Sequence, residues 1–91
     1  MRITRRRSNI EVICEMLRLG ENGAGKTEIM YSANMSYAQL QKYLGFLLSQ
    51  GLVNKLSNGN PIPTYHVTEK GLRLLRSIEV VLKALDWGED E

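Results

Sequence analysis

Eight residues in the first third of the chain match the formula of a phosphate-binding loop. Gly20 to Thr27 read GENGAGKT, which fits G-x-x-x-x-G-K-[ST] letter for letter. In a nucleotide hydrolase the backbone N–H groups of such a loop cradle phosphates, its lysine reaches the terminal phosphates and its threonine hydroxyl binds Mg²⁺. That chemistry requires a buried strand before the loop, a helix after it and a second strand that ends in an aspartate.

The surroundings of this segment do not supply that context. The preceding residues, IEVICEMLRL, have helical periodicity, and Ser8 with Glu11 forms the capping box S-x-x-E that begins a helix. Asp86 follows an apolar run, but that run also has a helical repeat. We therefore predict that the glycines form a turn between two helices, that Thr27 is the N-cap of the second helix, and that the chain is not a nucleotide hydrolase.

Other reactive side chains give no sign of catalysis. Cys14 lies among Ile10, Ile13 and Leu17, which predicts a buried and inert thiol. His66 has no histidine, cysteine or paired acids at a metal-binding spacing, so we expect it on the exposed face of a strand. No residues resemble a nucleophile with its base. The sequence predicts no enzyme, no cofactor and no metal site.

The charges are distributed unevenly along the 91 residues. The formal net charge is +2 at pH 7, but the first seven residues hold four arginines and no acid. The last six residues hold four acids and no base. A basic body with a separate acidic tail suggests a polyanionic partner.

Residues 26–51 have the pattern of two helices separated by a tight break. Ser36 suits the N-cap of the second helix, Gly51 suits the left-handed position after its last turn, and Asn34 tolerates that conformation at the break. Apolar residues at helical spacing predict a buried stripe on the second helix: Tyr37, Leu40, Leu44, Leu47 and Leu48. The opposite face is small and polar and has no acid: Ala38, Gln41, Lys42, Gly45 and Ser49. This helix-turn-helix pattern commonly places its second helix in the DNA major groove, and an ordinary solvated helix face is the alternative.

After Gly51 the apolar period changes from helix to strand. Residues 52–56 and 64–67 are predicted strands, and the seven residues between them, SNGNPIP, have strong turn chemistry. Thr68 then caps a long final helix that is predicted to reach Trp87. Three helices followed by a hairpin and a long helix is the order of a winged helix-turn-helix domain. The predicted class is therefore mainly α, within α+β.

The sequence also resembles a known family. The segments KTEIMYSANMSYAQLQKYLGFLLSQGLV and YHVTEKGLRLL are similar to small archaeal winged-helix DNA-binding proteins of the Sulfolobus 10a type. The resemblance covers about residues 10–85 and implies a winged domain whose long C-terminal helix pairs in an antiparallel coiled coil to form a homodimer. One departure is the predicted wing tip, residues 57–63, which has no arginine or lysine.

Together these patterns predict a protein that binds double-stranded DNA. The predicted phosphate and base contacts lie on the basic arm, the helix-turn-helix and the wing base: Arg5, Arg6, Arg7, Lys26, Thr27, Ser36, Tyr37, Gln39, Gln41, Lys42 and Lys55. The candidates for base contacts are Ser36, Gln39, Gln41 and Lys42, and Lys42 is also suited to a phosphate. The corresponding function is that of an archaeal transcriptional regulator or chromatin component. The alternative is a winged-helix adaptor that binds proteins and makes no direct contact with DNA.

The final helix carries an apolar stripe that predicts a dimer. Its residues are spaced by three and four: Leu74, Leu75, Ile78, Val81, Leu82 and Leu85. Two such helices paired side by side would bury both stripes, and small domains often gain core by symmetric association. The alternative is that the helix folds back on its own domain, with Leu72 and Val80 in contact with it.

The predicted organisation has four parts. A flexible basic arm covers residues 1–7, the winged domain residues 8–68, the dimerisation helix residues 69–87 and an acidic tail residues 88–91. No apolar run is long enough to span a membrane, and the N-terminal segment lacks a cleavage site of a signal peptide. These features predict a cytoplasmic, nucleoid-associated protein with no membrane partner.

Overall fold

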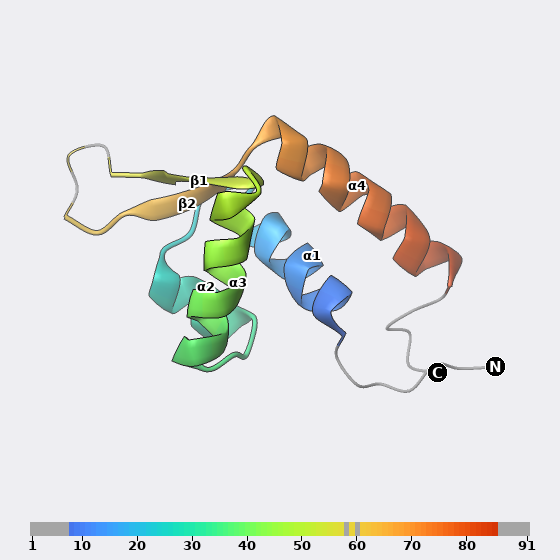
Figure 1. Ribbon diagram of the computed structural model, residues 1–91, viewed down its shortest axis with the longest axis horizontal. Helices are drawn as coiled ribbons and strands as arrows, with labels where there is room; N and C mark the ends of the chain where they lie inside the picture. The colour runs from blue at the N-terminus through green and yellow to red at the C-terminus, as the bar shows by residue number, and fades with distance from the viewer. Residues whose placement is uncertain (1–7, 58, 60, 86–91) are drawn as a thin grey trace.

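A computed structural model of the chain describes residues 8–57, 59 and 61–85. The helices α1 (Asn9–Leu19), α2 (Lys26–Ser32) and α3 (Tyr37–Ser49) are followed by a hairpin of β1 (Val53–Leu56) and β2 (Thr64–Val67), and then by α4 (Glu69–Ala84). The three short helices pack together, the hairpin projects from them, and α4 runs alongside α1 (Figure 1). The predicted mainly-α winged fold is confirmed. The basic arm and the acidic tail lie outside the described residues.

The first helix follows directly from its capping sequence. The Ser8 hydroxyl accepts a hydrogen bond from the Glu11 N–H, and the Glu11 carboxylate accepts one from the Ser8 N–H. This reciprocal box satisfies two backbone donors that a helix start leaves free. The bounds Asn9–Leu19 are those that the sequence predicts. Because a helix precedes Gly20, the strand that a phosphate-binding loop requires is not present there.

The start of α2 differs from the prediction. Its N-cap is Gly25, in an extended conformation, so the prediction of Thr27 as N-cap is wrong. The cause lies far away in the sequence, in an antiparallel bridge between Ala24 and Tyr65 with N···O distances of 3.1 and 2.8 Å. This bridge holds the chain extended up to Gly25. The helix therefore begins at Lys26, two residues before the predicted start.

The break between α2 and α3 has the geometry that its residues suggest. Asn34 adopts a positive φ of 53°, a conformation that asparagine tolerates better than most residues. At the start of α3 the Ser36 hydroxyl accepts from the Gln39 N–H, and the Gln39 side-chain oxygen accepts from the Ser36 N–H. At the other end Gly51 has a φ of 71° and reverses the chain toward β1. The predicted cap and both predicted turn residues are confirmed.

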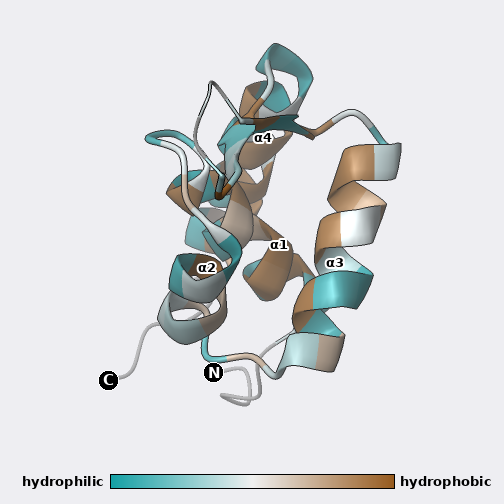
Figure 2. Cartoon of the chain, turned by 90° about the vertical axis from the view of Figure 1, so that its left-hand side faces the viewer, coloured by the Kyte–Doolittle hydropathy of each residue, from teal (hydrophilic) through white to brown (hydrophobic). Residues whose placement is uncertain are grey.

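The buried stripe of α3 is narrower than predicted. Leu40, Leu44 and Leu47 are buried, but Tyr37 is 58% exposed and Leu48 is 36% exposed. The inward side of the helix faces α1, and its other side carries hydrophilic colours (Figure 2). Only Leu40, Leu44 and Leu47 reach the core, so the predictions that Tyr37 and Leu48 are buried are wrong.

The hairpin pairs β1 with β2 in antiparallel register, from Val53 opposite Val67 to Leu56 opposite Thr64. Gly71, in the first turn of α4, packs directly against this sheet. A Cβ atom added to Gly71 would lie 2.2 Å from the Leu52 carbonyl oxygen, so no larger residue fits without a shift of the backbone. The glycine thus sets how closely α4 approaches the base of the wing.

The final helix begins at Thr68, as predicted. The Thr68 hydroxyl accepts from the Gly71 N–H and donates to the Gly51 carbonyl oxygen at 2.7 Å, so one side chain joins the end of α3 to the start of α4. Lys70 adds a second link, because its ammonium donates to the Gln50 carbonyl at 2.8 Å. The described part of the helix ends at Ala84 with Leu85 as its C-cap. Trp87, its predicted end, lies outside the described residues.

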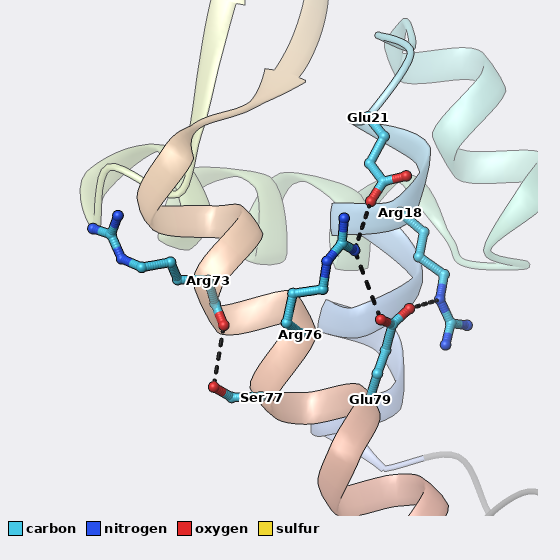
Figure 3. Close-up of polar contacts among 6 residues, drawn as sticks. All are labelled: Arg18, Glu21, Arg73, Arg76, Ser77 and Glu79. Carbon is cyan, nitrogen blue, oxygen red and sulfur yellow. Dashed lines mark hydrogen bonds and ion pairs between the residues drawn. The ribbon is translucent and has the colours of Figure 1, made fainter.

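Ion pairs complete the junction between α1 and α4. The Arg76 guanidinium lies 3.2 Å from the Glu21 carboxylate and 3.7 Å from that of Glu79, and Arg18 donates to Glu79 at 2.9 Å (Figure 3). The hydrogen bond to Glu79 raises the pKa of Arg18 above its usual value. These ion pairs lie where α4 runs beside α1.

Candidate nucleic-acid interface

The outer face of α3 is the surface that the sequence assigns to DNA. Ala38, Gln41, Lys42, Gly45 and Ser49 are all exposed there. A Cβ added to Gly45 would meet no atom within 4 Å, so at this point the helix backbone itself is open to a partner. No acidic residue occurs between residues 36 and 51. A low, polar and acid-free helix face can approach a phosphate-lined groove closely without charge repulsion.

The N-terminal end of α3 can still donate hydrogen bonds although it is capped. The cap uses the oxygen atoms of Ser36 and Gln39 as acceptors. It does not use the hydroxyl hydrogen of Ser36 or the amide NH₂ group of Gln39. With the exposed phenol of Tyr37, these groups form a set of donors at the positive end of the helix dipole. This suits them to phosphate oxygens.

Lys42 is exposed, and its ammonium lies 5.8 Å from the centre of the Tyr43 ring. The Tyr43 hydroxyl in turn donates to the Asn9 side-chain oxygen of α1. The charged end of Lys42 thereby lies over a ring that is fixed between two helices. Lys42 is exposed at this place, so a phosphate can reach it.

Lys26 and Thr27 lie at the start of α2, beside the wing. A groove of about 520 Å³ separates the start of α2 from the wing. Its lining residues are Gly25, Lys26, Thr27 and Glu28 on one side and Pro61, Ile62, Pro63 and Thr64 on the other. The groove is open and mostly apolar. The structure therefore brings the start of α2 next to the wing tip, which the sequence alone does not show.

The ion pairs between described residues lie on α1, on α4 and in the turn after α1. Arg18 pairs with Glu79, Arg76 pairs with Glu21 and Glu79, and Arg73 pairs with Glu69. Lys26, Lys42 and Lys55 take part in none of these pairs. The predicted phosphate contacts Arg5, Arg6 and Arg7 lie outside the described residues. The cations on α2, α3 and β1 thus keep their charge available for a partner.

The predicted dimer stripe of α4 is split by the fold. Leu75 and Ile78 are buried in the core of their own domain, and Leu74 and Leu82 are partly buried against it. Of the predicted stripe, only Val81 (52% exposed) and Leu85 (54% exposed) face solvent. Val80, which is not part of the predicted stripe, is also exposed, at 67%. Val80 was expected to contact the domain but faces solvent. The helix therefore both completes its own core and presents a second apolar surface.

Cys14 and His66 are both packed against neighbouring residues. Cys14 is buried, and burial raises the pKa of its thiol, as expected for an inert cysteine. His66 is half-buried: its Nε2 lies 2.9 Å from the Thr64 hydroxyl, and its ring covers Gly23, where a Cβ would lie 2.2 Å away.

The described residues include no group of three or more histidines, cysteines or acids that could hold a metal ion. No helix in the described ranges is long and apolar enough to cross a membrane.

Comparison with known proteins defines the class. The chain belongs to a winged helix-turn-helix family, whose model matches residues 6–85. Among solved structures it is similar to Sso10a-2, a DNA-binding protein from Sulfolobus solfataricus, with a TM-score of 0.79 and 34% identity over 88% of this chain and 83% of that one. The resemblance to archaeal proteins of the 10a type is thereby confirmed.

One further relative and one further solved structure extend the comparison. The uncharacterized protein MJ0287 of Methanocaldococcus jannaschii is 36% identical over 80% of this chain and 71% of its own length. A transcriptional regulator of the MarR family from Rhodococcus sp. RHA1 has a TM-score of 0.74 at 18% identity, and the match covers 82% of this chain and 56% of that one. The second likeness shows that the fold is shared.

Proposed function

We propose that this protein binds duplex DNA as a transcriptional regulator or chromatin component at the nucleoid, and that it has no catalytic role. The observation that carries the proposal is the outer face of α3, which is exposed, free of acids over its whole length, and carries the polar side chains of Gln41, Lys42 and Ser49. Sso10a-2, similar in both sequence and structure, is described as a DNA-binding protein. A helix face of this kind fits the major groove.

The proposed contacts divide into two kinds. Gln41 lies at the middle of the outer face, where an amide can make two hydrogen bonds to an adenine edge. Phosphate contacts are assigned to the exposed or partly exposed cations Lys26, Lys42 and Lys55, and to the arginines of the N-terminal arm. Thr27, Ser36, Tyr37 and Gln39 add neutral donors at the starts of α2 and α3. Phosphate contacts position the protein on the duplex, and the base contact supplies the preference for particular DNA sequences.

We further propose that α4 joins two chains into a homodimer, through antiparallel pairing of the helices. The surface that supports this is the exposed apolar group Val80, Val81 and Leu85, in the last two turns. Left in water, such a group favours association. Pairing at this end of α4 would hold two α3 helices apart, each free to contact DNA.

The direct test is a fluorescence-anisotropy titration of the full chain on random duplex DNA at several salt concentrations. Binding should weaken steeply with salt, because each cation that neutralises a phosphate releases condensed counterions. Affinity that stays flat from low to moderate salt would contradict the assigned phosphate contacts. Absence of binding at low salt would favour the adaptor function, in which the apolar surface of α4 binds another protein.

A further inference from the structure

The wing tip carries an apolar side chain in a position that the core does not explain. Ile62 is 72% exposed, although isoleucine is among the residues most often buried in proteins. The hairpin projects from the body of the domain, beyond α2 and α3 (Figure 1). Ile62 thus stands on a projection rather than on a flat surface.

The backbone around Ile62 is stiff. Pro61 and Pro63 flank it, and each proline fixes its own φ near −65°. A residue that precedes proline is also restricted to extended conformations, so Ile62 has little freedom to fold back. Both restrictions limit the backbone conformations that are open to this part of the wing. A side chain presented in this way loses little conformational freedom when it binds.

The charge around the tip indicates the kind of partner. Residues 57–63 contain no charged side chain, so the tip cannot bind phosphate by ion pairing. Two cations and one acid stand behind it: Lys55 is exposed on β1, and Lys26 and Glu28 lie across the groove from Ile62. An uncharged apolar point backed by lysines is the arrangement that minor-groove proteins use, because the lysines hold the backbone while an apolar wedge enters between bases.

The position of the wing fits this partner. β1 follows α3 after only the short turn at Gly51 and Leu52, so the wing begins at the C-terminal end of the recognition helix. In a duplex the major groove is bordered by the minor groove across one phosphate backbone. With α3 in the major groove, the projecting hairpin reaches toward the next groove.

We propose that the wing enters the minor groove and inserts Ile62 as a wedge at a base step, and this rests on the DNA-binding function proposed above. Insertion partly unstacks the step and bends the duplex toward the major groove. Flexible pyrimidine–purine steps, TA and CA/TG, cost least to unstack. The wing therefore contributes a preference for such steps without any hydrogen bond to a base.

The test combines two probes on the full-length protein. A duplex with 2-aminopurine beside a central TA step reports unstacking by its fluorescence, and dyes on the two ends report bending by energy transfer. The native chain should raise the fluorescence and bring the ends closer, by a bend of roughly 20–90°. Both signals should be lost with Ile62→Ala. Affinity should fall less than about tenfold, because the burial of Ile62 is offset by the cost of unstacking.

Two variants distinguish a wedge formed by Ile62 from other effects of the wing on DNA. Leu56→Ala removes an apolar side chain from the wing away from its tip and should leave both signals in place. Ile62→Lys adds a cation to the tip, so it should keep or raise affinity while abolishing the fluorescence signal. If the native chain binds DNA but neither unstacks nor bends it, the wedge is wrong and the DNA-binding proposal stands. If Ile62→Ala keeps both signals, another residue causes the bend and the assignment of Ile62 fails.

Discussion

The helices α3 and α4 are constructed alike on their inner sides and differently on their outer sides. Each begins at a hydroxyl cap, Ser36 or Thr68, and each buries leucines against α1 or the rest of the core. The outer face of α3 presents Gln41, Lys42 and Ser49 around an exposed glycine and has no acid, whereas the outer face of α4 ends in the exposed apolar residues Val80, Val81 and Leu85.

That difference separates two kinds of partner within one small domain. An acid-free polar face loses little when water is replaced by the polar edges of bases and phosphates. An apolar face gains most from another apolar surface, about 25 cal/mol for each Å² removed from water. Variants on each helix should therefore affect one partner and spare the other. Inner-face variants should affect both, because they unfold the domain.

The largest effect is expected from the inner faces. Leu40→Ala on α3 and Leu75→Ala on α4 each remove a fully buried side chain and should each lower the free energy of unfolding by about 2–5 kcal/mol. Urea unfolding at one fixed protein concentration measures this, with Leu56→Ala, outside the proposed partner surfaces, as the exposed control. A loss below about 1 kcal/mol for Leu75→Ala would mean that α4 is an appended arm rather than part of the core.

The next effect concerns the outer face of α4. Val81→Glu places a charge in the proposed dimer surface and should weaken association by roughly 2 kcal/mol or more, as for an interface hot spot. Sedimentation should then show a monomer where the native chain is a dimer. Ile78→Glu is a poor test, because Ile78 is buried and its replacement would unfold the domain.

A reciprocal control sharpens the comparison. Gln41→Glu, on the outer face of α3, should prevent DNA binding through charge repulsion and leave the sedimenting mass unchanged. A native chain that is monomeric at high micromolar concentration would contradict the dimer. So would a Val81→Glu chain that remains dimeric.

Smaller and more selective effects are expected within α3. Gln41→Ala should change the preference between DNA sequences by about 1–3 kcal/mol, because it removes the proposed base contact. Lys42→Ala should weaken all sequences alike and lower the salt slope by about one. Anisotropy titrations on several duplexes distinguish the two. Equal losses on every sequence for both variants would mean that α3 recognises only the shape of the groove.

The sequence predicts the parts of the fold that local chemistry decides. Ser8, Ser36 and Thr68 are all caps, and Asn34 and Gly51 adopt the left-handed turns expected of them. These features depend on hydrogen bonds within three or four residues, which a sequence pattern contains. The order of elements, and hence the winged fold, follows from them.

Features that depend on distant contacts were not predictable in the same way. The start of α2 is set by the bridge from Ala24 to Tyr65, which no local pattern indicates. Helical spacing predicts Leu75 and Val81 on one stripe, but the structure buries Leu75 against its own domain and leaves Val81 exposed, and this difference depends on the packing of α1 along α4. The exposure of Ile62 could have been suspected from its two flanking prolines. The position of Ile62 across a groove from Lys26 could not have been inferred from the sequence.

The smallest effect is expected at the charged junction between α1 and α4. Arg76 lies between Glu21 and Glu79, yet its side chain is 62% exposed, so solvent screens both pairs. Arg76→Ala should therefore cost less than about 1 kcal/mol of unfolding free energy, and high salt should remove most of the difference. Arg73→Ala, which removes only the 3.8 Å pair with Glu69, is the matched control and should cost less still. A loss for Arg76→Ala that approached that of Leu75→Ala would show that charges, rather than apolar packing, hold α4 to the domain. The division between an inner apolar face and an outer partner face would then fail for this helix.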